Sequence, residues 1–142
     1  MPKPIYPDEN FFLDVIVRYF ADIGCEEEES SGPDLICSAK DSGVRWVIEI
    51  VGGSEALESR FRAALGSLLS RMDAGPEANY ALVTADFPEY ALARIQVPEW
   101  TREVLNLSWF IVDEQGKVNA IPPYGPIDPA RLRRALEMEA KL

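Results

Sequence analysis

The sequence predicts an α/β fold in which a mixed central sheet of about five to six strands is flanked by helices. Three patterns carry this prediction: apolar residues at helical spacing before Gly24, two apolar strands joined by a turn between Pro33 and Gly53, and an apolar run from Asn79 to Ala85. The helical stretch between the last two patterns implies a parallel crossover. The predicted order is therefore helix, three strands, helix, strand, two helices, two strands and a final helix.

A chain of 142 residues is long enough for a domain with its own core, and no repeat or low-complexity linker divides it. We expect a single domain over residues 1–142. Its core covers about residues 8–121, and residues 122–142 form a connector and a helix. No window approaches the roughly 18 consecutive apolar residues of a membrane span, and the N-terminus lacks the apolar core of a signal peptide. The sequence favours a cytoplasmic protein without membrane contact.

The composition excludes several kinds of site. The chain has no histidine and two cysteines, Cys25 and Cys37, which are not spaced as a CxxC pair. Zinc sites of His and Cys, thiolate–His pairs and Ser-His-Asp hydrolysis therefore lack their residues. The formal net charge of −10 disfavours extensive contact with nucleic-acid phosphates, although a local basic face could still bind them. An unknown protein partner and a homodimer both remain open.

The first helix is predicted between the start signal at Asp8 and the stop at Gly24. Its apolar stripe consists of Phe11, Phe12, Val15, Ile16, Tyr19, Phe20 and Ile23. The acidic run Glu26–Glu29 then suits a short edge strand, because charges there discourage pairing with another chain. A solvated loop is the alternative for so many like charges.

The second half of the chain begins with a helix that Ser54 is expected to cap and that carries a long apolar stripe to Met72. After the apolar strand, the remaining core elements are two short helices and a closing hairpin: Phe87–Val97, Pro98 to about Leu107, Trp109–Asp113 and Val118–Ile121. A stiff connector with three prolines follows, and Asp128-Pro129 then begins a helix. One face of that helix carries Leu132, Ala135, Leu136 and Ala140. It could dock on its own domain or on a second subunit.

Two carboxylates converge at the open end of the first hairpin. If Lys40 pairs with Val44, then Asp34 lies opposite Ile50, and Asp34 meets Glu49 at the end away from the turn. An aspartate that starts a strand after proline and a glutamate at an exposed sheet end would give the same pattern without any function.

The layout around these carboxylates points to a family. A helix and an edge strand precede a Pro-Asp strand, a strand with Ile48-Glu49-Ile50-Val51 follows, and the next helix contains the run 64–69, Ala-Leu-Gly-Ser-Leu-Leu. This layout resembles the PD-(D/E)XK nuclease superfamily, which has the restriction-endonuclease-like fold. In size and order the chain is most similar to the small cyanobacterial element-excision controlling factors of that superfamily. The resemblance extends from Asp8 to Ile121.

The resemblance implies metal-assisted cleavage of phosphodiesters. Oxygen ligands hold Mg²⁺ or Mn²⁺, and the metal activates a water molecule and neutralises charge on the phosphate. By position, Asp34 would be the motif aspartate and Glu49 the motif acid, and both would be catalytic residues and metal ligands. Glu9 or Asp14 from the first helix would be further metal ligands. No other cofactor is implied.

Two positions depart from the family pattern. The superfamily lysine, which orients or deprotonates the attacking water and stabilises negative charge, is replaced by Val51, and the helix glutamine is replaced by Ser67. Lys40 lies about 20 Å from Asp34 at ~3.3 Å per strand residue, which is too far to substitute. Of the other lysines, Lys117 lies in another turn, and Lys3 and Lys141 lie near the termini. Arg60 or Arg62 could approach a phosphate, but arginine is a poor base.

Three functions remain open. The first is a non-catalytic nuclease-fold protein that binds or regulates, which Val51 and Ser67 favour. The second is a Mg²⁺-dependent nuclease with a degenerate site, which rests on Asp34 and Glu49 alone. The third is a protein–protein interaction module without nucleic-acid binding, which the acidic charge and the final helix favour. We rank the first and third ahead of the second, so enzyme activity is not expected.

Overall fold

The computed structural model describes residues 4–28, 34–40, 43–72 and 78–123 of the chain. The predicted final helix, and Glu29 of the acidic run, lie outside these residues. The elements in the described part are α1 (Glu9–Asp22), β1 (Cys25–Glu28), β2 (Leu35–Ala39), β3 (Arg45–Ile50), α2 (Leu57–Leu69), β4 (Ala78–Ala85), α3 (Pro88–Ile95), α4 (Glu99–Leu105), β5 (Leu107–Val112) and β6 (Val118–Ile121).

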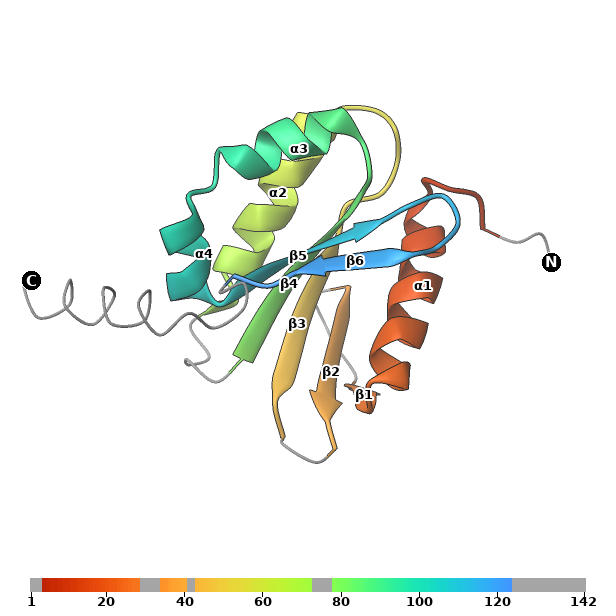
Figure 1. Ribbon diagram of the computed structural model, residues 1–142, viewed down its shortest axis with the longest axis vertical. Helices are drawn as coiled ribbons and strands as arrows, with labels where there is room; N and C mark the ends of the chain where they lie inside the picture. Colours follow the sequence, from red (N-terminus) through yellow and green to blue (C-terminus); the bar gives the residue numbers. More distant parts are fainter. Residues whose placement is uncertain (1–3, 29–33, 41–42, 73–77, 124–142) are drawn as a thin grey trace, which may run out of the picture.

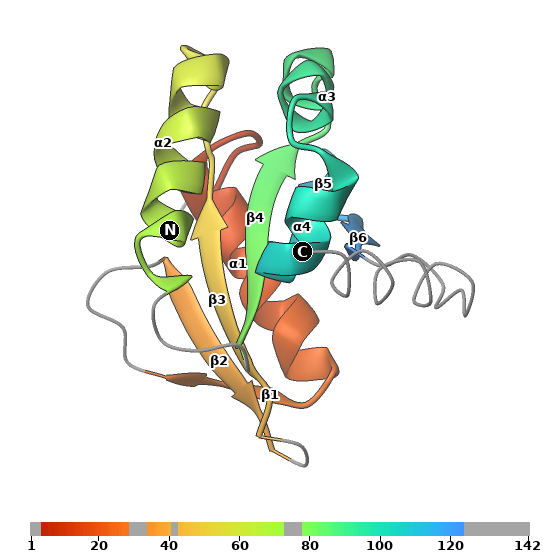
Figure 2. The same ribbon diagram turned by 90° about the vertical axis from the view of Figure 1, so that its left-hand side faces the viewer.

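The strands form one six-stranded sheet in the order in which they occur in the chain, from β1 to β6. β3, β4 and β5 run parallel, while β1, β2 and β6 are antiparallel to their neighbours. α1 covers one face of the sheet, and α2, α3 and α4 cover the other (Figures 1 and 2). The predicted mixed sheet, the edge strand of glutamates and the parallel crossover are confirmed. No helix in the described ranges has the length and apolarity needed to cross a bilayer.

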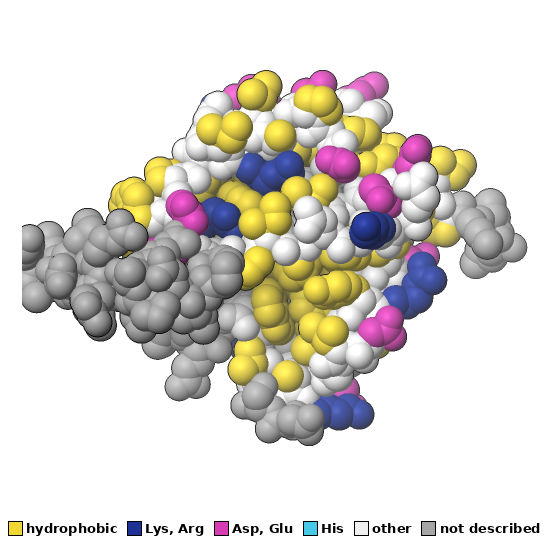
Figure 3. Space-filling model, viewed as in Figure 1, with side chains coloured by type: hydrophobic (Ala, Val, Ile, Leu, Met, Phe, Trp, Pro, Cys, Tyr) yellow, Lys and Arg dark blue, Asp and Glu magenta, His cyan; other side chains and the backbone are white. Residues whose placement is uncertain are grey.

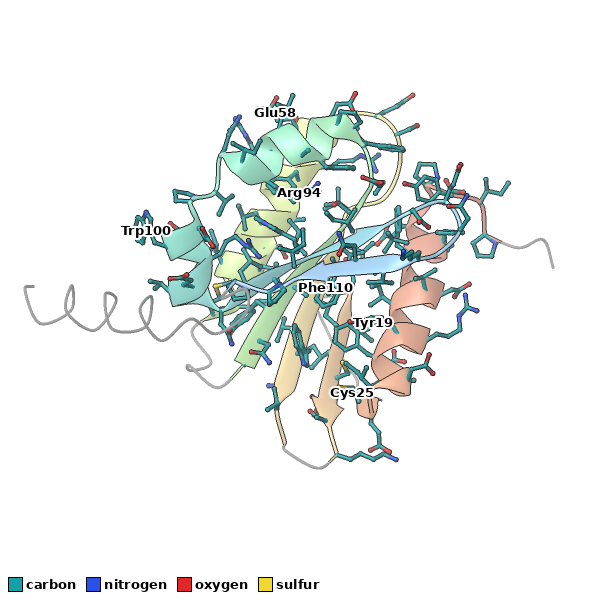
Figure 4. The ribbon with its side chains drawn as sticks, in the orientation of Figure 1. Tyr19, Cys25, Glu58, Arg94, Trp100 and Phe110 are labelled. Atoms are coloured by element: carbon teal, nitrogen blue, oxygen red, sulfur yellow. The ribbon has the colours of Figure 1, made fainter. Side chains whose placement is uncertain are left out.

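The face that α1 covers is built from aromatic rings. Phe20 lies with its ring centroid 5.3 Å from Trp46 and 5.5 Å from Phe110. Tyr19 packs edge-to-face on Phe110 at 5.6 Å, and Figure 4 shows these two side chains pointing toward one another. Trp46 of β3 lies on this face. Because side chains alternate along a strand, the even-numbered residues of β3 therefore point to this face and the odd-numbered residues, including Glu49, to the other.

The opposite face holds a buried arginine. Arg102 of α4 is 7% exposed, and its guanidinium lies 4.9 Å from the ring centre of Trp109 in β5. It donates hydrogen bonds from Nε to the Leu107 carbonyl at 3.2 Å and from Nη2 to the Ile121 carbonyl at 2.6 Å. α4 is thereby fixed to the beginning of β5 and the end of β6.

The register of the first hairpin differs from the predicted one by one residue. The predicted pairs were Lys40 with Val44 and Asp34 with Ile50, but Ala39 donates its N–H to the Val44 carbonyl at 2.8 Å and Leu35 pairs with Ile48. The Lys40 N–H instead donates to the Gly24 carbonyl at 3.2 Å, which draws Lys40 out of the ladder. Extended by one residue, the observed register places Asp34 opposite Glu49.

Two element boundaries also differ from prediction. α2 begins at Leu57 and not after Ser54, because Ala56 adopts a left-handed conformation (φ 52°) at the helix N-cap. β5 begins at Leu107, two residues before the predicted Trp109. The reason is that Asn106 ends α4 in a left-handed conformation and its carbonyl already accepts from the Tyr80 N–H of β4 at 3.0 Å.

The N-terminal segment lies across the carboxyl ends of the parallel strands. The Tyr6 hydroxyl accepts from the Asp86 N–H at 3.1 Å and donates to the Val112 carbonyl at 3.2 Å, so it joins the ends of β4 and β5. The Pro7 carbonyl accepts from the Gly53 N–H at 2.8 Å, directly after β3. These bonds bring the start of α1 to the end of β3, where Asp34 and Glu49 lie.

Candidate carboxylate site

Asp34 and Glu49 approach each other because the hairpin register places them side by side. Directly opposed residues of an antiparallel pair point to the same face of the sheet, so both carboxylates lie on the α2 face. The predicted register would have put them on opposite faces. Asp34 Oδ2 also accepts a hydrogen bond from the Ile50 N–H at 2.7 Å, which fixes the carboxylate against the end of β3.

Glu49 is held between β3 and α2 and is 8% exposed. Ser67 Oγ donates to Glu49 Oε1 at 2.9 Å, and Arg71 Nε lies 3.8 Å from the same oxygen. The pKa of Glu49 is raised to about 7, chiefly by burial; the negative charge of Asp34 and a hydrogen bond with it contribute to the rise, whereas Ser67 and Arg71 oppose it. Glu49 is therefore a carboxyl group that holds a proton up to neutral pH.

Glu9 completes a group of three carboxylates. It is the first residue of α1, and a Cβ on Gly52 would lie 2.7 Å from the Glu9 Cα, so the helix start and the end of β3 are in close contact. Burial raises the pKa of Glu9, as do the charge of Asp34 and a hydrogen bond with it, while Arg60 opposes the shift. Asp34 therefore stands between two carboxyl groups that retain protons more readily than usual.

Two arginines of α2 and its C-terminal turn flank the carboxylates. Arg60 donates from Nη1 to the Gly52 carbonyl at 2.7 Å, which places its charge beside Glu9. Arg62, the other predicted candidate, is exposed and pairs with Glu58 at 2.8 Å. Arg71, which was expected on a solvated face of the helix, instead lies beside Glu49. Its spacing of four residues from Ser67, one helical turn, is the signal that could have placed it beside Glu49.

Val51, which the resemblance in sequence places at the position of a lysine, is buried. Val51 is 3% exposed, and its N–H donates to the Val83 carbonyl of β4 at 2.8 Å. Lys40 pairs with Glu26 at 3.0 Å at the turn end of the hairpin, and Lys117 follows the turn between β5 and β6. Lys3 and Lys141 lie outside the described residues. Within residues 4–28, 34–40, 43–72 and 78–123, neither lysine reaches Glu49.

Asp14, the other candidate ligand from α1, is exposed on the helix surface. It lines a groove of about 670 Å³ along α1, together with Asp34, Arg18 and Glu27. Glu27 thus brings one charge of the acidic run to the side of the site. Glu26 and Glu28, on the other face of β1, pair with Lys40 and Arg45.

The residues present do not form a metal cage. Among the described residues, no three Asp, Glu or Cys side chains are arranged to hold a cation. One oxygen of Asp34 is occupied by a backbone N–H, and one oxygen of Glu49 by the Ser67 hydroxyl. A hard divalent cation needs several oxygen ligands that are free to bind it, whereas Asp34 already shares hydrogen bonds with both Glu9 and Glu49. The donor set therefore does not fit the implied Mg²⁺ or Mn²⁺.

The fold and this site define a class of protein: a small α/β protein with carboxylates at the end of a hairpin and, in the part of the chain that the structure describes, no lysine beside them. The solved structures similar in fold include an XisH family protein from Nostoc punctiforme, with a TM-score of 0.53 and 14% identity over 78% of this chain and 98% of that one. An fdxN element excision controlling factor protein from Anabaena variabilis has a TM-score of 0.52 and 14% identity over 79% and 98%. No protein-family model and no curated protein sequence match the chain. At this identity the likeness concerns the fold, and the predicted similarity in fold to the excision controlling factors is confirmed.

Proposed function

We propose that the chain is a binding or regulatory protein that uses a restriction-endonuclease-like scaffold without cleaving nucleic acid. Val51 carries this proposal. It occupies the position at which the PD-(D/E)XK superfamily has its lysine, it lies on the same face as Glu49, and it is 3% exposed. A buried valine neither orients an attacking water molecule nor stabilises charge that develops on a phosphate.

The state of the carboxylates supports the same conclusion. Glu49, with its pKa raised to about 7 by burial, is protonated in much of the protein at neutral pH. A metal-binding carboxylate has to be deprotonated, so this burial weakens Glu49 as a ligand. The hydrogen bonds give both carboxylates a structural role. The bond from the Ile50 N–H to Asp34 links the two strands of the hairpin, and the bond from Ser67 to Glu49 links the hairpin to α2.

The charge of the molecule and the description of one relative in fold favour a regulatory role. The Anabaena variabilis protein is described as an element excision controlling factor, which is a name for control and not for cleavage. We infer a controlling role for the present chain as well. Its formal net charge of −10 favours a protein partner over the phosphate backbone of a nucleic acid.

The test is a cleavage assay on the full chain with supercoiled, single-stranded and branched DNA in Mg²⁺ or Mn²⁺. We expect no product above a buffer control. Asp34→Ala is the matched control, because it removes the motif aspartate and would abolish any genuine activity of this site. Robust turnover by the wild type that disappears in Asp34→Ala would overturn the proposal.

A second candidate is a metal-dependent nuclease with a degenerate site. The convergence of Glu9, Asp34 and Glu49 favours it, because a cation entering between them would displace their protons and relieve their repulsion. Calorimetric titration of the full chain with Mn²⁺ tests it. Binding that is lost in Glu49→Gln would keep this candidate, and an absence of heat with the wild type would remove it.

A further inference from the structure

The outward sides of α3 and α4 carry an apolar surface, which we call the α3–α4 surface and define by Leu92, Ile95, Trp100 and Val104. These side chains are 66%, 78%, 68% and 76% exposed. In Figure 4, Trp100 points away from the sheet, and Figure 3 shows hydrophobic side chains at the surface over these helices. Single exposed apolar residues are ordinary, but four large ones on two successive helices indicate a surface that another element can cover.

The inward sides of both helices are already used. Tyr90 and Ala93 of α3 are buried, and Arg94 donates from Nη1 to Thr84 Oγ1 of β4 at 2.9 Å. Arg102 of α4 is buried against Trp109. The α3–α4 surface therefore faces away from the sheet, and neither helix can turn it inward without breaking these contacts.

We propose that the α3–α4 surface is the docking site for residues 128–142 of the same chain. The first argument is where the described chain ends. Arg102 of α4 holds the Ile121 carbonyl at 2.6 Å, and Pro123, the last described residue, is buried. Residues 124–127 link this point to Asp128, and the five residue steps from Pro123 to Asp128 span at most about 18 Å. The short connector therefore keeps the start of the terminal segment within reach of α4.

The second argument is the match between the two apolar patterns. Leu132 and Leu136 are one helical turn apart in the sequence, as are Trp100 and Val104 on α4. An amphipathic helix of 15 residues is marginal alone in water and gains its stability by burying its apolar face. The α3–α4 surface supplies the apolar area that such a helix lacks.

The third argument is charge. The terminal segment has the arginines Arg131, Arg133 and Arg134 in its first half, whereas the acidic residues Glu137 and Glu139 lie in its second half. The helices of the α3–α4 surface bring Glu89 and Glu99, each in the first turn of its helix. Opposite charges at the rim of an apolar contact set its register and discourage wrong partners.

A short connector favours the same chain over a second copy. Tethering raises the local concentration of the segment to about the millimolar range, which a separate molecule would have to reach in solution. The proposal does not depend on the carboxylate site or on the proposed function, because none of its residues takes part in either.

Trp100 makes the proposal measurable in the full chain by acrylamide quenching of tryptophan fluorescence. In the wild type we expect Trp100 to be protected. The double variant Leu132→Glu with Leu136→Glu should raise the quenchable fraction of the emission severalfold, and adding Trp100→Phe should abolish that rise. The matched control is Ala130→Glu with Met138→Glu, which adds the same two charges away from the apolar stripe and should leave the quenching unchanged.

Hydrogen exchange and sedimentation complete the test. The amides of α4 should exchange faster in the Leu132→Glu, Leu136→Glu variant than in the wild type, while the amides of β3 and β4 remain unchanged as a check on folding. Equal quenching and equal exchange in the two proteins would overturn the proposal. Protection of Trp100 that grows with protein concentration, together with a sedimenting dimer, would assign the surface to a second copy and also overturn it.

Discussion

Consecutive residues of β3 enter two environments that differ in what they contribute. Ile48 and Ile50 face α1, where they join the aromatic packing of Phe20. Glu49 and Val51 face α2, where the buried Glu49 carboxyl group meets the Ser67 hydroxyl and the Asp34 carboxylate. The first face supplies stability that does not depend on pH, whereas the second holds groups whose ionisation opposes folding. One strand thus takes part in both the aromatic packing and the candidate site.

The largest effect should come from the aromatic face. Phe20→Ala removes a ring that is 1% exposed and that contacts Tyr19, Trp46 and Phe110. We expect the free energy of unfolding to fall by about 3–5 kcal/mol, equally at acid and neutral pH, because the loss is one of packing. Urea unfolding followed by circular dichroism measures it. Ile5→Ala, at a side chain 71% exposed, should change stability by less than about 0.5 kcal/mol. A loss below 1 kcal/mol in Phe20→Ala would contradict the role given to this cluster.

The contact between α1 and the end of β3 gives the next effect. In Gly52→Ala, the new Cβ would lie 2.7 Å from the backbone of Glu9, and neither backbone can move without disturbing the carboxylates. We expect a loss of about 1–3 kcal/mol. Gly66→Ala is the matched control in α2, where a Cβ would meet nothing within 4 Å. That variant should gain about 0.5–1 kcal/mol from helix propensity. Thermal unfolding of both variants distinguishes the two sites, and equal shifts would show that the Glu9 contact is not rigid.

Glu49→Gln should separate the two faces by their response to pH. The pKa of Glu49 is raised from 4.5 to about 7 by burial, so the folded protein keeps a proton that the unfolded chain has already released. This contribution to stability is full below pH 4.5 and is lost as the pH rises through about 7. Relative to the wild type, Glu49→Gln should therefore become more stable by about 1–3 kcal/mol between roughly pH 4 and pH 8.

Urea unfolding of Glu49→Gln across that pH range makes the measurement, and Phe20→Ala provides the comparison with the other face. Glu9 also has a raised pKa, so some slope should remain in the variant. Glu58→Gln, at an exposed ion pair with Arg62, should change stability by less than about 1 kcal/mol throughout. A pH profile that is identical in wild type and Glu49→Gln would rule out Glu49 as the buried titrating group.

Most of the fold could be predicted because it depends on periodicity and on turn residues, both of which are local. The helical spacing of Phe12, Ile16 and Phe20 predicted α1, and apolar runs bounded by turn residues predicted most of the strands. The predicted register of the first hairpin was wrong, because Lys40 donates its N–H to the Gly24 carbonyl and this bond joins residues distant in sequence. A shift of one residue then changed the face on which Asp34 lies.

The candidate site was predicted in part for the same reason. The spacing of Val51 from Glu49 along one strand predicted that the two residues share a face of the sheet. The helix motif singled out Ser67. Glu9 and Asp14 were both candidates from the first helix, and the sequence could not choose between them, since the approach of Glu9 depends on the absence of a side chain at Gly52 and on the bond from Gly53 to Pro7. Sequence patterns show which residues share an element, but not how closely two elements approach.

The smallest effect should come from Ser67→Ala, which probes the link between α2 and the carboxylates. Removing the hydroxyl that donates to Glu49 Oε1 at 2.9 Å should raise the pKa of Glu49 further, because this bond favours the charged form. We expect a loss of about 1 kcal/mol at neutral to alkaline pH and a smaller loss where Glu49 is protonated. Ser59→Ala, at an exposed position of the same helix, controls for the change in helix propensity. The pH midpoint of the stability profile measures the shift directly. A midpoint that moves downward in Ser67→Ala would contradict this prediction. It would mean that the Ser67 hydroxyl stabilises the protonated form of Glu49, whereas the hydrogen bond in the structure favours the charged form.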